Sequence, residues 1–585
     1  MLIKDVVRFS SQHRTLYCYL ILSIWIFLIV AGMYKYMGVS DPSSNFMTTN
    51  GFYASDATMS SSKKDQENYK RHKMHEKDCN PTEVISAGDD GGVLESFSLQ
   101  GVLLLTRHGD RGPMTHVRGI NDVDCDQDGD TLLNKYRTFV QNLTTATSTT
   151  SGLWQKMGNF HGFPLLPPTN KACLLGQLTS KGVSQMLKIG EIIRNAYMAQ
   201  LNFYQKNGVF NRQGNTTTEA TPIYDPDEII IYSTRYRRTF QSAMALMYAF
   251  IPSDRWHTLQ IQEAHSYNYC FSDCACQKAD QLQSAIEKNR NANMAQHPAV
   301  NAIVQWVGSS LLENPAPNIN ALDVRDAVLA LVCHGAPLPC RFAKKETNDD
   351  NENENIGGTS TVVSDADVIN IDQDDSQAPT GSEKSDETVD DVLDEIDNEA
   401  PEGCIDQSQV DTIMSFTRYQ GTKDIRSKDN RDLGLLRAYG LMRELNAAML
   451  RMISGDKVKF VLYSAHDRTI QNLASALGVF LDVPFIPYAT RMNFEVYKSE
   501  KDTQFYFRVV YNGQDITNQI SFCEGGRSLR VNRGIRGSKA DLCPIENIIR
   551  FIHDDYFQNM NATNFKDACQ VTTTAQREYL NLNNY

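Results

Sequence analysis

A short apolar stretch followed at once by charged and small residues constrains this chain more than any other feature. It reads GVLLLTRHGDRGP over residues 101–113, and its four consecutive apolar residues, Val102–Leu105, favour a buried β-strand over a helix. Arg107 and Arg111 flank His108 where this strand ends. Guanidinium groups match phosphate oxygens in a bidentate way, and a histidine held between them could attack phosphorus. A basic surface turn after a core strand is the simpler alternative.

Polar side chains also follow two further predicted strands, 228–234 (EIIIYST) and 458–465 (VKFVLYSA). The residues that follow these strands are Arg235, Arg237, Arg238, His466 and Asp467. Because ligands bind at the carboxyl ends of strands in open α/β sheets, we expect the three strand ends to share one site. A second His-Asp pair, His553-Asp554, lies in a helical run and is interpreted as a polar helix face.

Strands alternate with helical segments along the chain. Apolar residues recur at helical spacing behind Thr179, and an apolar-faced helix is predicted over 235–250. Segments 493–497 and 505–511 predict a closing pair of strands. This order favours the α/β class, with a mixed sheet flanked by helices on both faces. A long helical region, at about 265–455, predicts an inserted, mainly α lobe.

The acidity of the chain is concentrated in one segment. Residues 346–402 hold twenty Asp and Glu against one Lys, a local charge of −19 that leaves +6 for the rest of a chain whose formal charge is −13. The low-complexity stretch 344–403 lacks apolar residues to offset the entropy of ordering, which predicts a disordered surface loop. A charge of +6 over the remainder is too dilute to indicate a surface that attracts anionic glycans, and no nucleic-acid partner is expected.

The N-terminal region predicts a membrane anchor. Leu16–Tyr34 is an uncharged apolar run of 19 residues, which spans about 29 Å as a helix and exceeds the apolar core of a cleaved signal peptide, the alternative interpretation. Three basic residues precede the run and only Lys35 follows closely, so positive-inside bias places the N-terminus in the cytosol. We expect a cytoplasmic tail at 1–15, a single-pass type II anchor at 16–34, a stem at 35–94, a luminal domain at 95–570 and a tail at 571–585.

Cysteines and sequons agree with a secretory location. Of thirteen cysteines, Cys18 lies in the apolar run, and the other twelve suit disulfides in an oxidising compartment, with the pairing left open. Metal ligation is the alternative, although the spacings match no zinc site. The residues that a metal site would use are Cys270, Cys274, Cys276, Cys333, His334 and Cys340. The candidate glycosylation sites are Asn142, Asn215 and Asn561.

The polar groups at the three strand ends suit phosphoryl transfer through a covalent histidine. The transferred group spreads negative charge over three oxygens, so fixed cations stabilise it, and arginines can supply them without a metal or cofactor. A neutral imidazole serves as nucleophile, and a carboxyl group protonates the departing alkoxide. Asp467 is the best-placed acid.

Four stretches resemble segments of the histidine acid phosphatases. RHGDRGP resembles the family signature RHGxRxP, and LYSAHDRTI resembles its C-terminal His-Asp segment. The other two are QLTSKGVSQMLKIGEIIRNAY and YSTRYRRTFQSAMA. The resemblance covers about 95–570, and the family's arginine precedes Thr-x-x-Ser-Ala, which matches Arg238 and neither Arg235 nor Arg237. It implies a histidine-phosphatase-like fold, His108 as nucleophile, Asp467 as proton donor, and Arg107, Arg111, Arg238 and His466 as phosphate ligands.

Further stretches resemble a Golgi type II branch of that family: YNYCFSDCACQ, YNGQDITNQISFC, CPIENIIRFI and FKDAC. This likeness implies a phosphorylated glycan substrate, the 2-O-phosphate on xylose in the glycosaminoglycan–protein linkage region, and a role in proteoglycan synthesis. It names no glycosyltransferase partner. Two alternatives remain. One is a broad-specificity or lipid/inositol-phosphate acid phosphatase of the secretory pathway, and the other is a non-catalytic luminal protein that binds phosphorylated glycans.

Overall fold

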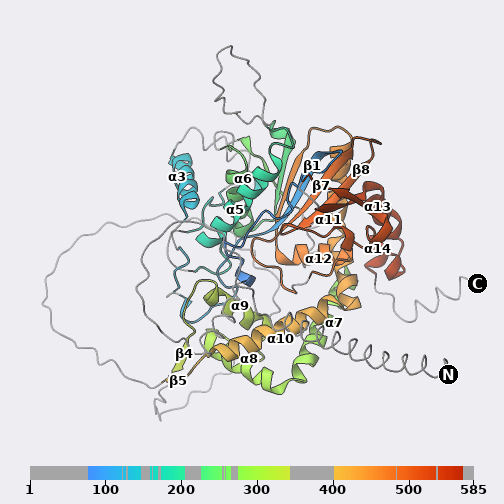
Figure 1. Ribbon diagram of the computed structural model, residues 1–585. Coiled ribbons are helices and arrows are strands. Elements are labelled where there is room, and N and C mark those ends of the chain that lie inside the picture. The colour runs from blue at the N-terminus through green and yellow to red at the C-terminus, as the bar shows by residue number, and fades with distance from the viewer. Residues whose placement is uncertain are drawn as a thin grey trace, which may run out of the picture. The chain divides into compact units, whose positions relative to one another are not determined.

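The computed structural model describes most of the chain from Lys77 to Gln570 (Figure 1). The predicted anchor, the acidic segment up to residue 400, both terminal tails, Asn215, Cys270 and Cys274 lie outside the described residues. No helix in the described part is both long and apolar enough to cross a membrane. The described ranges are 77–120, 123–126, 130–145, 158–160, 162–168, 173–203, 225–252, 256, 258–264, 275–342, 401–481, 484–534 and 538–570.

A mixed sheet lies at the centre of the described chain. Its order is β10-β11-β8-β7-β1-β6-β2-β3, with β9 beside β8. Strands β1, β6, β2 and β3 are parallel, whereas β7, β8, β10 and β11 continue the sheet in antiparallel fashion. The strands are β1 Phe97–Arg107, β2 Ile229–Ser233, β3 Ile261–Glu263, β6 Phe460–Ala465, β7 Arg491–Ser499, β8 Phe505–Tyr511, β9 Gln514–Asp515, β10 Leu529–Asn532 and β11 Lys539–Pro544.

Helices cover both faces of the sheet, as predicted. Side chains alternate between faces along a strand, so Leu104 and Leu462 face one core while Leu103 and Val461 face the other. The first core is closed by α3 (Thr131–Thr145), α5 (Ser180–Tyr197) and α6 (Arg237–Phe250). The second is closed by α7 (Gln277–Ala295), α11 (Lys428–Ile453), α12 (Asp467–Leu477) and α13 (Ile545–Arg550). The predicted Thr179 cap of α5 is confirmed, because its side chain accepts a hydrogen bond from the Gly182 N–H.

The helical lobe is narrower than the predicted range 265–455. Helices α8 (Pro298–Leu311), α9 (Ala321–Val332) and α10 (Gln407–Ile425) share a core of their own, whereas α7 and α11 pack on the sheet. Helical periodicity shows that one face of a helix is apolar, but it does not show against which core that face packs. The predicted boundaries of the lobe are therefore wrong, although its helices are present. The predicted loop 344–403 also ends too late, since β5 (Pro401–Cys404) pairs with β4 (Cys340–Phe342).

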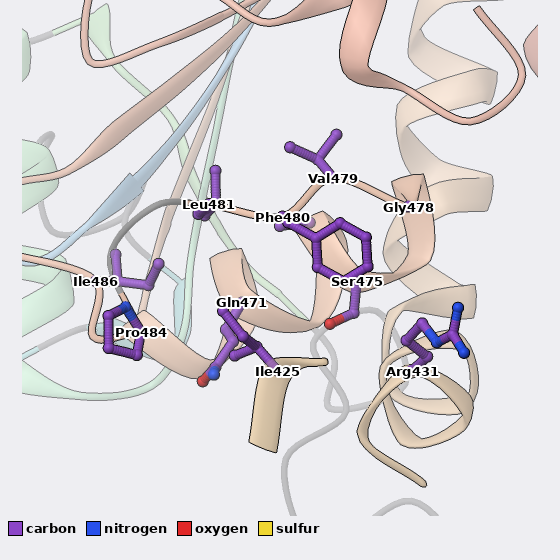
Figure 2. A pocket seen from close by; sticks show the side chains of 11 residues that line it. Ile425, Arg431, Gln471, Ser475, Gly478, Val479, Phe480, Leu481, Pro484 and Ile486 are labelled. Carbon is purple, nitrogen blue, oxygen red and sulfur yellow. The ribbon is translucent and has the colours of Figure 1, made fainter. Parts of the chain in front are cut away.

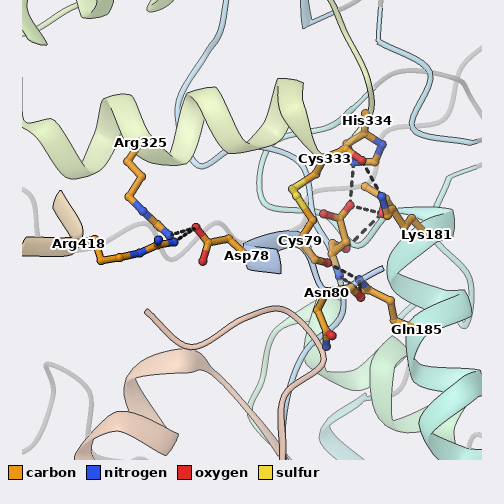
Figure 3. Close-up of a disulfide and its surroundings, with 11 residues drawn as sticks. Asp78, Cys79, Asn80, Lys181, Gln185, Arg325, Cys333, His334 and Arg418 are labelled. Carbon is orange, nitrogen blue, oxygen red and sulfur yellow. Dashed lines mark hydrogen bonds and ion pairs between the residues drawn. A yellow bond between two sulfur atoms is a disulfide. The ribbon is translucent and has the colours of Figure 1, made fainter. Parts of the chain in front are cut away.

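Residues 77–94 belong to the folded domain, so the predicted stem 35–94 is wrong over this part. We call residues 77–94 the N-terminal strap. Its Cys79 forms a disulfide with Cys333, and Asp78 lies 3.0 Å from Arg325 (Figure 3). The strap is held mainly by a disulfide and polar contacts, and these leave no apolar periodicity in the sequence.

The predicted disulfides are confirmed among the described cysteines. Cys276, Cys333 and Cys340 are disulfide-bonded, so the metal-ligand alternative is wrong for these three thiols. The described pairs are Cys79–Cys333, Cys125–Cys173, Cys276–Cys569, Cys340–Cys404 and Cys523–Cys543. The second His-Asp pair, His553-Asp554, is exposed on a π-helical turn, as the polar-face interpretation predicts.

Candidate functional site

The carboxyl ends of β1, β6 and β2 lie level with one another in the sheet. Arg107 pairs in register with Ala465, and Ser464 pairs with Ser233, so the residues that follow the three strands meet at one edge. The rings of His108 and His466 are 5.5 Å apart between centroids. The residues that the sequence analysis singled out from distant segments therefore lie together.

His108 is buried and presents one ring nitrogen for chemistry. Its Nδ1 lies 2.8 Å from the Gly109 carbonyl oxygen, which can only accept a hydrogen bond. This partner assigns the proton to Nδ1 and leaves the lone pair on Nε2. Burial, followed by the charges of Arg238 and Arg107, holds the pKa of His108 well below its usual value of 6.5. The imidazole is therefore neutral and nucleophilic over the ordinary pH range.

The loop that carries His108 is fixed by close backbone packing. A Cβ at Gly109 would lie 2.3 Å from the Gly182 carbonyl oxygen, so only glycine fits against the start of α5. The Gly109 N–H donates to Ser242 Oγ at 3.1 Å on α6. Two helices thus hold the nucleophile loop in place.

Asp110 anchors the same loop from within. Its Oδ2 accepts a hydrogen bond from Thr179 Oγ1 at 2.6 Å and lies 2.8 Å from His334 Nε2. Burial raises the pKa of Asp110, but the contacts with His334 and Thr179 outweigh it and lower the pKa below the usual value. His334 was considered only as a metal ligand from the sequence. The structure places it against Asp110 in the loop that carries His108. Figure 3 shows His334 beside the Cys79–Cys333 disulfide.

Two arginines from this loop are held by groups far away in the sequence. The Arg107 guanidinium lies 4.1 Å from the centroid of the Tyr488 ring, and its Nη1 donates to the Ile486 carbonyl. Arg111 makes a bidentate pair with Asp326, at 2.8 and 3.3 Å. Tyr488 and Asp326 follow no strand that the sequence marks, so the sequence analysis missed both.

The third arginine comes from the β2 end. Arg238 is half-buried and stacks 4.6 Å from the Tyr236 ring centroid, whereas Arg235 and Arg237 are exposed. Burial and the nearby charge of Arg111 lower the pKa of Arg238 to about 10. Burial is the larger cause, and a bound oxyanion would offset the repulsion between Arg238 and Arg111.

The β6 end supplies His466 and Asp467. His466 Nε2 lies 2.9 Å from Thr234 Oγ1, and burial followed by Arg238 lowers the pKa of His466 to about 3. Asp467 lies 3.4 Å from Arg107, and its side chain is 46% exposed on the open side of the site. Partial burial raises the pKa of Asp467, but Arg107 and Arg111 outweigh it and hold the pKa at about 2.

These groups converge at one edge of the sheet, where they suit the binding of a tetrahedral dianion beside His108. Three guanidinium groups supply donors, the neutral imidazole of His108 supplies a lone pair, and the half-exposed carboxyl group of Asp467 lies beside Arg107. In the described part of the chain, no cluster of His, Cys, Asp and Glu is arranged to hold a metal ion. The arrangement suits phosphoryl transfer to His108 Nε2.

The family match and the named sequence relatives agree with this chemistry. A family described as "Histidine phosphatase superfamily (branch 2)" matches residues 98–512. The chain is 24% identical over 497 residues to 2-phosphoxylose phosphatase 1 of Xenopus tropicalis, covering 84% of this chain and 81% of that protein. The Homo sapiens protein of that name is 24% identical over 507 residues, covering 84% and 85%. Among solved structures, apo phytase of Hafnia alvei aligns with 82% of this chain and 99% of its own, at a TM-score of 0.39 and 14% identity.

Proposed function

We propose that this chain, which belongs to the histidine phosphatase superfamily (branch 2), hydrolyses phosphate monoesters through a phosphohistidine on His108. Family membership makes it a phosphoric monoester hydrolase of the histidine acid phosphatase type. The observation that carries the mechanism is the Nδ1 contact of His108 with the Gly109 carbonyl, because it leaves Nε2 free to attack.

In the first step, His108 Nε2 attacks phosphorus, a P–N bond forms and the P–O bond to the leaving group breaks. Arg107, Arg111 and Arg238 neutralise the charge on the phosphoryl oxygens, and His466 donates a further hydrogen bond. Asp467 passes its proton to the departing alkoxide oxygen.

The proton on Asp467 depends on the bound phosphate. Arg107 and Arg111 hold the pKa of Asp467 at about 2 in the free enzyme, although partial burial raises it. A bound dianion offsets those guanidinium charges, so the pKa of Asp467 rises and the carboxyl group takes up a proton. In the second step, the Asp467 carboxylate accepts a proton from water, which attacks phosphorus, breaks the P–N bond and releases inorganic phosphate.

We infer the substrate from the relatives. The proteins named 2-phosphoxylose phosphatase 1 match over 84% of this chain, which supports the 2-O-phosphate of xylose in the glycosaminoglycan–protein linkage region as substrate. We further propose a Golgi location with a type II anchor at 16–34 and a luminal catalytic domain. The five disulfides in the described residues and exposed sequon residues at Asn142 and Asn561 support an oxidising lumen.

Two substitutions test the proposed mechanism. We expect His108→Ala to abolish both turnover and acid-labile phosphoenzyme. Asp467→Asn should slow esters with poor leaving groups most, because p-nitrophenolate departs without a proton. Retained turnover in the His108 variant would exclude the proposed nucleophile.

The substrate is tested by comparing kcat/KM on a phosphoxylosyl linkage tetrasaccharide with kcat/KM on generic phosphate esters. Equal values would favour the broad-specificity alternative over the phosphoxylose assignment.

A further inference from the structure

A polar cleft continues from the phosphate site. It has a volume of about 300 Å³ and lies between the helical lobe on one side and α11 and α12 on the other. Asp467 and Asp326, the partners of Arg107 and Arg111, line the cleft. A group bonded to the transferred phosphate would therefore extend into it, and the residues that line the cleft meet the leaving group.

Most cations in the cleft are already neutralised. Of the described lining residues, Arg290 lies 2.6 Å from Asp424, Arg437 lies 3.1 Å from Asp280, and Arg325 lies 3.0 Å from Asp78. Arg468 is the one lining cation in the described chain without a carboxylate partner. A second phosphate group on the substrate would thus find a single free cation instead of the several that bind the first.

Three side-chain amides in the cleft have no hydrogen-bond partner within the described chain. Asn430, Gln471 and Asn472 are half-buried and line the cleft, and within the described chain their side chains make no hydrogen bond. Each amide offers two donors and one acceptor, which matches the mixed donor and acceptor character of hydroxyl groups. Half-buried polar groups without protein partners are suited to a ligand.

Helical spacing sets the distance of two of these amides, Gln471 and Asn472, from Asp467 and Arg468. Gln471 follows Asp467 by four residues on α12, and Asn472 follows Arg468 by four. Each pair therefore shares one helix face and is separated by about 6 Å along the axis. Gln471 and Asn472 therefore lie one helical turn beyond Asp467 and Arg468, where a sugar ring would extend from its phosphate, and Asn430 lines the same cleft from α11.

The neighbouring apolar pocket is too small for a lipid chain. Gln471 lies at the boundary between the cleft and this pocket, which is otherwise lined mainly by residues such as Phe480, Leu481 and Pro484 (Figure 2). The volume of the apolar pocket is about 20 Å³, which leaves room for little more than one water molecule. The site beyond the phosphate is therefore polar, and its net charge is close to zero because four arginines and four aspartates line the cleft.

We propose that Asn430, Gln471 and Asn472 form a subsite for the hydroxyl groups of the sugar that carries the phosphate. The subsite selects an uncharged, hydroxyl-rich leaving group over a polyphosphate or an acyl chain. This proposal rests on the proposed phosphatase function and deepens it, because it assigns substrate selection to named side chains.

The test compares substrates on the full chain and its Gln471→Ala/Asn472→Ala variant. For the phosphoxylosyl linkage tetrasaccharide we expect kcat/KM to fall about 30-fold, mostly through KM, since two hydrogen-bonding groups are lost. Turnover of p-nitrophenyl phosphate, which has no sugar hydroxyls, should fall less than about threefold. Gln283→Ala is the matched control, because this lining amide already donates a hydrogen bond to Glu287 at 2.7 Å. It should leave kcat/KM unchanged for both substrates.

The outcomes separate this proposal from the function on which it rests. Equal losses on both substrates in the double variant, or no loss on the tetrasaccharide, would overturn the subsite and leave the phosphatase mechanism standing. Absence of all phosphatase activity in the unsubstituted chain would overturn both. Inositol hexakisphosphate or lysophosphatidate turned over by that chain as fast as the tetrasaccharide would also reject the selectivity. Asn472→Lys should raise inositol hexakisphosphate turnover, since it adds a free cation.

Discussion

The charge on His108 determines how the enzyme should respond to pH. Burial and the surrounding arginines hold the pKa of His108 well below 6.5, so acidification from pH 7 to 5 does not protonate the nucleophile. In the proposed mechanism, the group that needs a proton in the first step is Asp467. We therefore expect kcat at saturating substrate to hold or rise between pH 7 and 5, measured with an alkyl phosphate. A loss of kcat with a midpoint near 6.5 would indicate that His108 keeps its ordinary pKa.

The ring of Tyr488 contacts two of the arginines that we propose to bind phosphate. The ring centroid lies 4.1 Å from the Arg107 guanidinium and 5.9 Å from that of Arg111. Cation–π contacts of this kind contribute up to about 2 kcal/mol when desolvated, so Tyr488→Leu should raise KM for phosphate esters roughly 5- to 30-fold. Tyr488→Phe keeps the ring and serves as the control. Identical KM values for the two variants would rule out a contribution from the ring.

The sequence predicts those site residues that lie next to a recognisable element, such as an apolar strand. Arg107 and His108 lie at the end of one apolar strand and His466-Asp467 follows another, and parallel strands bring their carboxyl ends together. Tyr488 reaches the site from a loop before β7, and Asp326 reaches it from α9, a helix of the inserted lobe. No strand-end pattern marks these positions, and their proximity to the arginines depends on tertiary packing.

Among the elements, the sheet and its helices were more predictable than the lobe or the strap. Strand β8 matches its predicted bounds, 505–511, because its β-forming residues are bounded by polar turns. The N-terminal strap shows no such periodicity, and its contacts are with residues hundreds of positions away. The lobe boundary was missed because α11 is apolar toward the sheet core, which the sequence pattern does not identify.

The strap should be indispensable for folding. It contributes Cys79 to a disulfide that closes a loop of 254 residues, and Asp90 to a buried pair with Arg491 at 2.6 Å. Loss of a native disulfide costs about 2–5 kcal/mol and an orphaned buried charge about 3–5 kcal/mol, together comparable to the stability of a domain.

We accordingly expect a secreted chain that begins at Lys77 to fold and one that begins at Glu95 to aggregate. Secretion yield and thermal melting measure the difference. An equally stable, active chain from Glu95 would restore the predicted stem boundary at residue 94. Cys340→Ser/Cys404→Ser in the longer chain controls for the loss of a disulfide as such, because that pair joins β4 to β5 and does not hold the strap.

In the whole molecule, the segment that carries most of the negative charge can be separated from the folded domain. The segment 346–402 carries a local charge of −19, whereas the rest of the chain is mildly basic. The strands on either side are antiparallel neighbours, since Phe342 pairs with Pro401 and Cys340 with Cys404. A two-residue turn can join two such strands without moving either one.

Replacing residues 343–400 by Asn-Gly should therefore leave the catalytic domain intact. The Asn-Gly pair suits the tight turn that joins antiparallel strands. We expect Tm to change by less than about 2 °C and kcat/KM for p-nitrophenyl phosphate to stay within about twofold, because fold-determining contacts are kept. Removing residues 340–404 is the matched control: it also deletes β4, β5 and a disulfide beside the lobe core, so Tm should fall by several degrees. A large loss of kcat/KM in the Asn-Gly variant at unchanged Tm would instead mean that the acidic segment acts on the phosphate site.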